Sequence, residues 1–225
     1  MSSGNTIAVI GDIHGCYNTL ADLYDHIKHV NEIYSVGDLI DRGKYSKEVV
    51  EFCIEKSIRP VKGNHEDMMI RVLNRPDNFL GFKFEAAENY YLNGGQETQR
   101  SYTGLDSFDG FIKFKQELKS LGHFDYLKNL PMKYEIHKVI ISHAGIIDGG
   151  NDVTILWNRK RPAHLEQFQI FGHTPHKKVV YRKNYYSNID TGCVYKNKLT
   201  AAIIDSATGK INETFQIGCR SIDVY

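Results

Sequence analysis

Short apolar runs, many of them β-branched, recur along the chain and predict buried strands. The runs are TIAVI (6–10), EIYSV (32–36), SIRPV (57–61), KVIIS (138–142), QIF (169–171), YYSNI (185–189) and LTAAII (199–204). Apolar positions at helical spacing predict helices over 16–30, 46–57 and 66–75, the second of which has Ser46 as its expected N-cap. Strand and helix therefore alternate in the first 75 residues, and strands dominate the last 90 or so, which together predict an α/β fold.

Residues 76–130 interrupt this pattern with aromatic and charged side chains. We predict two helices there, near 83–92 and 109–121, and a glycine-containing loop, NGGQETQRSYTG, between them. We interpret the segment as a helical insertion in a single domain that spans 1–225. It would act either as a cap over a site or as a helical pair that covers one face of a sheet.

The composition excludes several classes of function. With 28 basic and 27 acidic side chains, the 225-residue chain lacks the basic excess of surfaces that bind nucleic acids or membranes. The apolar run near the N-terminus is too short for a signal peptide, and no run approaches the roughly 20 apolar residues of a membrane span. We therefore expect a cytoplasmic protein. The four cysteines are widely spaced without a CxxC pair, which predicts reduced structural thiols.

Potential metal ligands follow five of the apolar runs. In chain order they are Asp12, His14, Asp38, Asn64, His143 and His173. Ligands in open α/β sheets bind at the carboxyl ends of the strands, so we expect these side chains to lie together. Mixed imidazole and carboxylate ligands suit manganese, iron or zinc rather than calcium. Six ligands are too many for one tetrahedral ion, but they match two ions that share a carboxylate.

The neighbouring residues indicate chemistry at phosphorus. Two-metal sites stabilise in-line displacement at phosphorus, and Arg42, one residue after Asp41, has the guanidinium group that binds phosphate oxygens. His65 follows Asn64 and is left without a role as a ligand, which makes it a candidate general acid. Asp41 is a candidate to orient its imidazole.

Three motifs carry a resemblance to a known family. GDIHG (11–15), GDLIDRG (37–43) and GNHE (63–66) together resemble the phosphoprotein-phosphatase type of metallophosphoesterase, within the calcineurin-like superfamily. SHAG, LWNR, FGHTP and IDTGCVYKNKLTA resemble its compact bacterial and phage branch, typified by the phage lambda serine/threonine phosphatase. The resemblance implies a calcineurin-like αββα sandwich, with the helical insertion near 76–130.

The resemblance also implies a role for each site residue. The first ion would be bound by Asp12, His14 and Asp38, and the second by Asp38, Asn64, His143 and His173. His65 would be the general acid, paired with Asp41, while Arg42 and Arg159 would bind the phosphoryl oxygens. The cofactors would be two divalent transition-metal ions, manganese before iron or zinc. The chain departs from the eukaryotic enzymes in reading His-Ala-Gly at 143–145, where they have His-Gly-Gly.

The implied activity is that of a metal-dependent phosphomonoesterase, foremost a protein serine/threonine phosphatase, in which a hydroxide held by both ions attacks phosphorus in line. The alternative is a hydrolase of dinucleoside polyphosphates such as diadenosine tetraphosphate. That branch tends to lack the DRG acid and to read GNHD, whereas this chain has Asp41 and Glu66. A third hypothesis, a non-catalytic phosphate-binding module, conflicts with the complete set of ligands and the candidate acid. The expected partners are a phosphorylated protein or peptide, or a small phosphate ester or nucleotide, and neither nucleic acid nor membrane.

Overall fold

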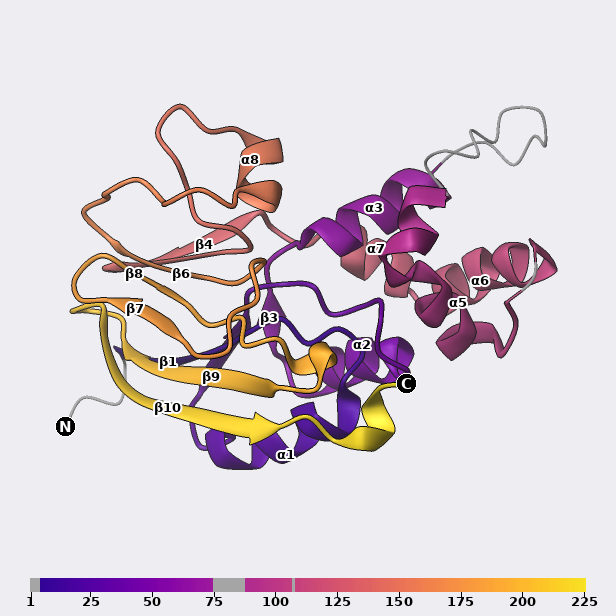
Figure 1. Ribbon diagram of the computed structural model, residues 1–225, viewed down its shortest axis with the longest axis horizontal. Coiled ribbons are helices and arrows are strands. Elements are labelled where there is room, and N and C mark those ends of the chain that lie inside the picture. Colours follow the sequence, from indigo (N-terminus) through magenta and orange to yellow (C-terminus); the bar gives the residue numbers. More distant parts are fainter. Residues whose placement is uncertain (1–4, 75–87, 107) are drawn as a thin grey trace.

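The computed structural model describes residues 5–74, 88–106 and 108–225, and in them two five-stranded sheets stack face to face (Figure 1). The first sheet, sheet A, has the order β10-β9-β1-β2-β3. Its strands are β1 (Thr6–Ile10), β2 (Glu32–Ser35), β3 (Arg59–Pro60), β9 (Lys198–Asp205) and β10 (Lys210–Gly218). The second, sheet B, has the order β4-β5-β6-β8-β7. Its strands are β4 (Lys133–Ile136), β5 (Val139–Ser142), β6 (Phe168–Phe171), β7 (Val180–Arg182) and β8 (Tyr186–Asn188).

Alternation along β1 explains the layering of the molecule. Ile7 and Val9 point into the core between the two sheets, whereas Ala8 and Ile10 belong to the core between sheet A and the helices. Burying side chains of this size contributes about 1.5–3 kcal/mol each relative to exposure. Because β1 is buried on both faces, its sequence is a continuous apolar run rather than an alternating one.

Parallel pairing brings the carboxyl ends of the central strands to a common edge in each sheet. β1 pairs in parallel with β2, and β2 with β3. In sheet B, β5 pairs in parallel with β6, and β6 with β8. The outer strands β4, β7 and β10 pair antiparallel with their neighbours. The apolar runs did not predict these three outer strands, because many of their residues are polar and at least partly exposed.

The three predicted helices of the first part of the chain are confirmed. They are α1 (Tyr17–Ile27), α2 (Ser46–Glu55) and α3 (Asn64–Leu73). Ser46 is the first helical residue rather than the N-cap, which is Tyr45. The hydroxyl of Ser46 instead accepts a hydrogen bond from the backbone N–H of Asp41, at 3.1 Å. A shorter helix, α8 (Asp152–Trp157), lies on the outer side of sheet B (Figure 1), so that the expected sandwich of two sheets and flanking helices is confirmed.

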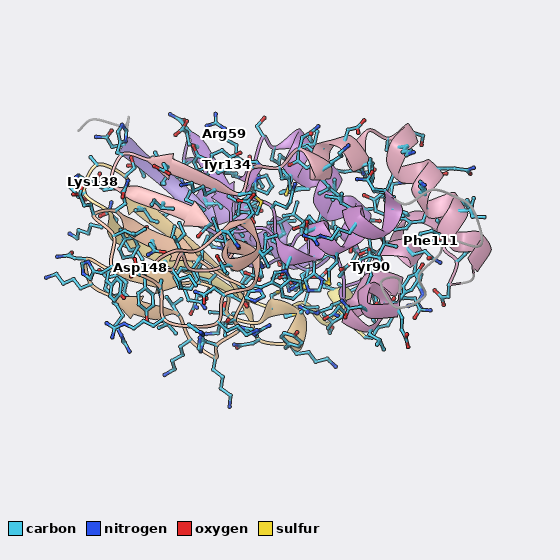
Figure 2. The ribbon with its side chains drawn as sticks, turned by 90° about the horizontal axis from the view of Figure 1, so that it is seen from above. Arg59, Tyr90, Phe111, Tyr134, Lys138 and Asp148 are labelled. Carbon is cyan, nitrogen blue, oxygen red and sulfur yellow. The ribbon has the colours of Figure 1, made fainter. Side chains whose placement is uncertain are left out.

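The insertion extends from one end of the sandwich next to α3 (Figure 1). It contains a π-helical turn, η3 (Tyr91–Gly95), followed by α5 (Gln96–Thr103), α6 (Phe108–Ser120) and α7 (His123–Lys128). The helix predicted near 109–121 is α6. Another helix was predicted near 83–92, and residues 83–87 of that range lie outside the described part of the chain. Residues 88–90 are helical, and residues 91–92 begin η3. Figure 2 shows Tyr90 where the insertion meets the sandwich, with Phe111 farther out.

The loop predicted between those helices is wrong. Residues 96–103 form α5, which buries Thr98, Gln99 and Tyr102. The glycines that suggested a loop mark the two limits of this helix: Gly94 has a φ of 99° at the kink before it, and Gly104 has a φ of 71° at its C-cap. Two short 3₁₀ turns, η4 (Cys193–Tyr195) and η5 (Ser221–Asp223), lie in the last part of the chain. No helix in the described ranges is both long enough and apolar enough to span a bilayer.

Candidate active site

Two loops that follow β1 and β2 form the base of the site. A Cβ atom on Gly15 would lie 2.7 Å from the backbone oxygen of Gly43, and one on Gly43 would overlap the backbone oxygen of His14. Only glycine permits so close an approach of the two backbones. The N–H of His14 then donates to the backbone oxygen of Asp38 at 2.8 Å. Glycines of the first two motifs thus bring His14 and Asp38 together.

Backbone strain occurs in these two loops and in the loop after β6. Five candidate residues have positive φ angles: His14 (46°), Asp38 (50°), Asp41 (74°), Arg42 (70°) and His173 (68°). Each such conformation costs a non-glycine residue about 1–3 kcal/mol, and it persists where the surrounding contacts hold it. Strain of this kind clusters at functional sites, which supports the assignment of this region as the site.

Glu66 is one of the residues that hold the strained loop. Its carboxylate accepts the backbone N–H groups of Asp38 at 3.0 Å, Leu39 at 2.8 Å and Gly63 at 2.8 Å. Burial, together with the nearby charge of Asp38, raises the pKa of Glu66 to about 7. Glu66 therefore acts as a positioning residue for Asp38, a role that the sequence analysis did not predict.

Asp38 lies at the centre of the polar cluster. Its Oδ2 is 3.4 Å from Nε2 of His143, 3.5 Å from Nε2 of His14 and 3.9 Å from Nε2 of His65. Burial alone would raise the pKa of Asp38, but the surrounding imidazoles outweigh burial and lower it. Two groups of potential ligand atoms share this carboxylate: His14, Asp38 and His65, and Asp38, His143 and His173. Asp38 is the member common to both groups, while the first group contains His65 rather than the predicted ligand Asp12.

A second cluster of acceptors surrounds Asn64. Its Oδ1 is 2.8 Å from Nε2 of His143 and 2.9 Å from Nδ1 of His173. Nδ1 of His143 lies 2.8 Å from the backbone oxygen of Val36, which can only accept, so Nδ1 carries the proton and Nε2 offers a lone pair. The Nε2 lone pair of His143 therefore faces the amide oxygen of Asn64. Two acceptors so close repel one another, and a bound cation would remove this repulsion.

The same reasoning applies to His14. Its Nδ1 lies 2.8 Å from the backbone oxygen of Ile40, which leaves a lone pair on Nε2. Nε2 is 2.7 Å from Nη1 of Arg42 and 3.5 Å from Oδ2 of Asp38. Ligand histidines commonly donate their other N–H to a backbone carbonyl in this way. Burial lowers the pKa of His14, and it lowers the pKa of His173 to about 3. Both imidazoles are thus kept neutral, as metal binding requires.

Asp12 completes the proposed ligand set. Its carboxylate accepts the backbone N–H of His173 at 3.1 Å, so it connects the loop after β1 to the loop after β6. Burial raises the pKa of Asp12, and the charges of Asp190 and Asp38 raise it further. Buried carboxylates that repel one another are stabilised by a bound cation. Because the donors are imidazole nitrogens and carboxylate or amide oxygens, they fit divalent transition-metal ions.

The candidate acid is held by the sandwich and the insertion together. Nδ1 of His65 is 2.6 Å from Oδ2 of Asp41, and both side chains are buried. The other oxygen of Asp41 accepts hydrogen bonds from Thr98 of α5 at 2.6 Å and from the hydroxyl of Tyr90 at 3.1 Å. Burial lowers the pKa of His65, but the carboxylates of Asp38 and Asp41 outweigh it and raise the pKa overall.

A pocket of about 100 Å³ opens beside these residues. Four predicted residues line it: His14, Arg42, Arg159 and His173. The structure thus brings every predicted site residue into one region, with Arg159 exposed just after α8. Nη1 of Arg42 lies 2.7 Å from Nε2 of His14, and its guanidinium carbon lies 5.6 Å from the ring centroid of Tyr195.

Pro175 follows β6, and the other pocket residues come from the segment after β8; they are Asp190, Gly192, Cys193, Val194 and Tyr195. The sequence analysis noted the motif IDTGCVYKNKLTA in that segment but predicted no site residue there. Burial raises the pKa of Asp190 to about 7, with the charge of Asp38 acting in the same direction. Asp190 directly follows the apolar run 185–189. The strand-end signal that located the other carboxylates was therefore present here as well.

Comparison with known proteins identifies the family. Residues 6–189 match the calcineurin-like phosphoesterase family, and the chain belongs to it. The chain is 30% identical to the asymmetrical bis(5'-nucleosyl)-tetraphosphatase PrpE of Oceanobacillus iheyensis, over 87% of each chain. It is also 28% identical to serine/threonine-protein phosphatase 2 of Salmonella typhimurium, over 86% of this chain and 90% of that one.

Solved structures support the same fold. A putative diadenosine tetraphosphatase superposes with a TM-score of 0.67 at 19% identity, over 96% of this chain and 95% of the other. A Saccharomyces cerevisiae protein serine/threonine phosphatase gives a TM-score of 0.60 at 16% identity, over 99% of this chain and 82% of the other. The protein is therefore a metallophosphoesterase by family and by fold.

Proposed function

We propose that the protein is a dinuclear phosphomonoesterase that hydrolyses phosphoserine and phosphothreonine in proteins or peptides. The observation that carries the proposal is the buried pair of His65 and Asp41, whose Nδ1 and Oδ2 atoms are 2.6 Å apart. A serine alkoxide is a poor leaving group and needs a proton as it departs. An imidazole held in one tautomer by a carboxylate can deliver that proton.

The ligands are proposed as two overlapping sets. One ion would be bound by Asp12, His14 and Asp38, and the other by Asp38, Asn64, His143 and His173, with manganese as the proposed metal. Bound divalent ions supply Lewis acidity, which neutralises charge on the phosphate and lowers the pKa of water.

The remaining groups of the site are protein side chains. Arg42 and Arg159 line the pocket and would bind the phosphoryl oxygens, since a guanidinium matches phosphate geometry. Asp41 holds Nδ1 of His65, which leaves Nε2 on the side of Asp38 and of the proposed metal centre. His65 can thus present a proton to the leaving oxygen while Arg42 and Arg159 fix the phosphate.

Comparing leaving groups tests the role of His65. We expect His65→Asn to slow hydrolysis of a phosphoserine peptide by about 10²–10⁴-fold, the usual contribution of general acid catalysis. Hydrolysis of para-nitrophenyl phosphate should slow much less, because para-nitrophenolate leaves without a proton. Metal content, measured by elemental analysis, should stay at the wild-type level. Equal slowing of both substrates at full metal content would rule out the acid role.

A second candidate function is hydrolysis of dinucleoside polyphosphates. Two exposed aromatic side chains favour it. Tyr195 lines the pocket and is 58% exposed, and Trp157 is 40% exposed, with its ring 5.9 Å from that of the pocket residue His173. Exposed aromatic rings near a phosphate site are suited to stack on a nucleobase, a contact worth about 1–3 kcal/mol. The relative from Oceanobacillus iheyensis is named for an activity of this kind.

A direct comparison of substrates distinguishes the two functions. If the protein is a phosphomonoesterase for proteins, wild-type kcat/KM should be higher for the phosphoserine peptide than for diadenosine tetraphosphate, and Tyr195→Ala should affect both alike. A dinucleotide hydrolase would show the reverse order, and Tyr195→Ala would selectively raise KM for the dinucleotide by about tenfold. Tyr181→Ala, at an exposed tyrosine on β7, is the control.

A further inference from the structure

Three of the four cysteines converge beside the pocket, although they are far apart in the sequence. The Sγ atoms of Cys16, Cys193 and Cys219 all lie within 4.8 Å of one another. Cys16 is the N-cap of α1, Cys193 begins η4, and Cys219 directly follows β10. All are free thiols, as the sequence analysis expected, but their convergence was not predicted. Cys53, buried in α2, is not part of this cluster.

The environments of the three sulfur atoms differ. Cys16 and Cys193 are fully buried, whereas Cys219 is partly exposed. The thiol of Cys16 donates to the backbone oxygen of His14 at 3.6 Å, and the thiol of Cys219 donates to that of Arg220 at 3.5 Å. An ion from solvent can therefore reach the cluster first at Cys219.

We propose that Cys16, Cys193 and Cys219 form a second metal site, in which three thiolates bind one thiophilic cation of the zinc, cadmium or copper(I) class. Three sulfur atoms at the usual metal–sulfur distance of about 2.3 Å around a trigonal ion would lie about 4.0 Å apart. That separation falls within the observed limit of 4.8 Å. Closing the site requires only small movements of side chains.

The ligand chemistry separates this site from the candidate active site. Thiolates select soft or borderline cations, while carboxylate and amide oxygens suit harder ions such as manganese. Binding converts the thiols to thiolates, so each ion taken up releases protons. This inference does not rest on the proposed phosphatase function, since it concerns different residues and a different class of ion.

The position of the cluster gives the ion a structural consequence. Cys193 lines the pocket, and Cys16 is two residues after His14. An ion bound to all three sulfur atoms would cross-link the pocket wall to the start of α1 and to the segment after β10. We expect its binding to stabilise the 190–197 segment, which contains Asp190 and Tyr195.

Cadmium titration tests the site without any measurement of hydrolysis. Protein kept reduced with a phosphine and saturated with manganese is titrated with Cd²⁺, and the ultraviolet sulfur-to-cadmium charge-transfer band is followed. The band should saturate at one cadmium per chain. Oxygen and nitrogen ligands give no such band, so cadmium in the candidate active site would not be counted.

Variants assign the band to the cluster. Cys219→Ser changes a partly exposed residue and should therefore keep the fold. Loss of an outer-shell partner usually weakens metal binding by about 10–100-fold, so loss of the direct ligand Cys219 should weaken cadmium binding by more than that. Cys53→Ala, at the buried cysteine outside the cluster, should leave the titration unchanged. Absence of the band in folded wild-type protein, or a band that persists unchanged in Cys219→Ser, would overturn the proposal.

Discussion

Asp41 is the residue that connects the acid to the rest of the protein. One of its oxygens contacts Nδ1 of His65, and the other accepts hydrogen bonds from Thr98 and Tyr90. With both oxygens held, the carboxylate has a fixed orientation, so it fixes the imidazole ring and its tautomer as well. The Nε2 proton of His65 is therefore directed toward Asp38.

The pH dependence of hydrolysis should report this pair. Because neighbouring carboxylates raise the pKa of His65, the imidazole stays protonated to higher pH than an ordinary histidine. Activity toward a phosphoserine peptide should be present below this pKa and should fall as the pH rises through it. Asp41→Asn removes one of the two charges, so the alkaline limb of kcat/KM should move to lower pH.

Para-nitrophenyl phosphate serves as the control for this experiment. Its leaving group needs no proton, so its alkaline limb should be at nearly the same pH in wild type and Asp41→Asn. An alkaline limb that does not move for the phosphoserine peptide would show that His65 is not the titrating acid.

Residues of the site differ in how far the sequence reveals them. Asp12, His14, Asp38 and the other proposed ligands follow apolar runs, and this local signal located them. Tyr90 carries no such signal, because it reaches Asp41 across 49 positions of sequence and only the packed insertion brings them together.

At the scale of elements, the insertion does more than cover a surface. The backbone N–H of Arg42 donates to the backbone oxygen of Gly94 at 3.0 Å, and α5 supplies Thr98 to Asp41. The insertion therefore contacts both the candidate phosphate-binding arginine and the residue that orients the acid. Its function as a substrate-selecting cap remains a prediction.

Gly94 offers a test of this contact. A Cβ at Gly94 would lie 2.6 Å from Cγ and 2.7 Å from the backbone nitrogen of Arg42, so Gly94→Ala should displace the arginine. We expect inhibition by inorganic phosphate to weaken by about tenfold, equivalent to about 1.4 kcal/mol. The measurement is the inhibition constant of phosphate against para-nitrophenyl phosphate hydrolysis.

Gly104→Ala is the matched control. Gly104 also has a positive φ, 71°, but a Cβ at Gly104 would have nothing within 4 Å of it. Gly104→Ala therefore carries a left-handed backbone cost of about 1–2 kcal/mol without displacing Arg42. Only Gly94→Ala should change phosphate affinity. The same inhibition constant in both variants would show that this contact does not position Arg42.

At the scale of the whole molecule, the site joins the two sheets. Nδ1 of His143, which follows β5 in sheet B, donates to the backbone oxygen of Val36, which follows β2 in sheet A. Asp12, after β1, accepts the backbone N–H of His173, after β6. Ions shared by these ligands would bind the two halves of the sandwich together.

The sequence predicted much of this architecture, but by two different routes. Apolar runs and helical spacing located the buried strands and the first three helices. The stacking of two sheets followed only from the family resemblance, because no local pattern tells which strands pair across 100 or more positions, as β1 and β9 do. The mostly polar edge strand β10 gave no apolar run to detect.

The central claim is that Asp38 is shared by two metal ions, and metal analysis of Asp38→Asn tests it most directly. Wild-type protein, purified with manganese, should contain close to two ions per chain by elemental analysis. Asp38→Asn should lose both ions or retain them only weakly, and its turnover should collapse. Asp190→Asn, at a neighbouring buried carboxylate outside the proposed ligand set, should retain both ions. Two ions and normal turnover in Asp38→Asn would contradict the account.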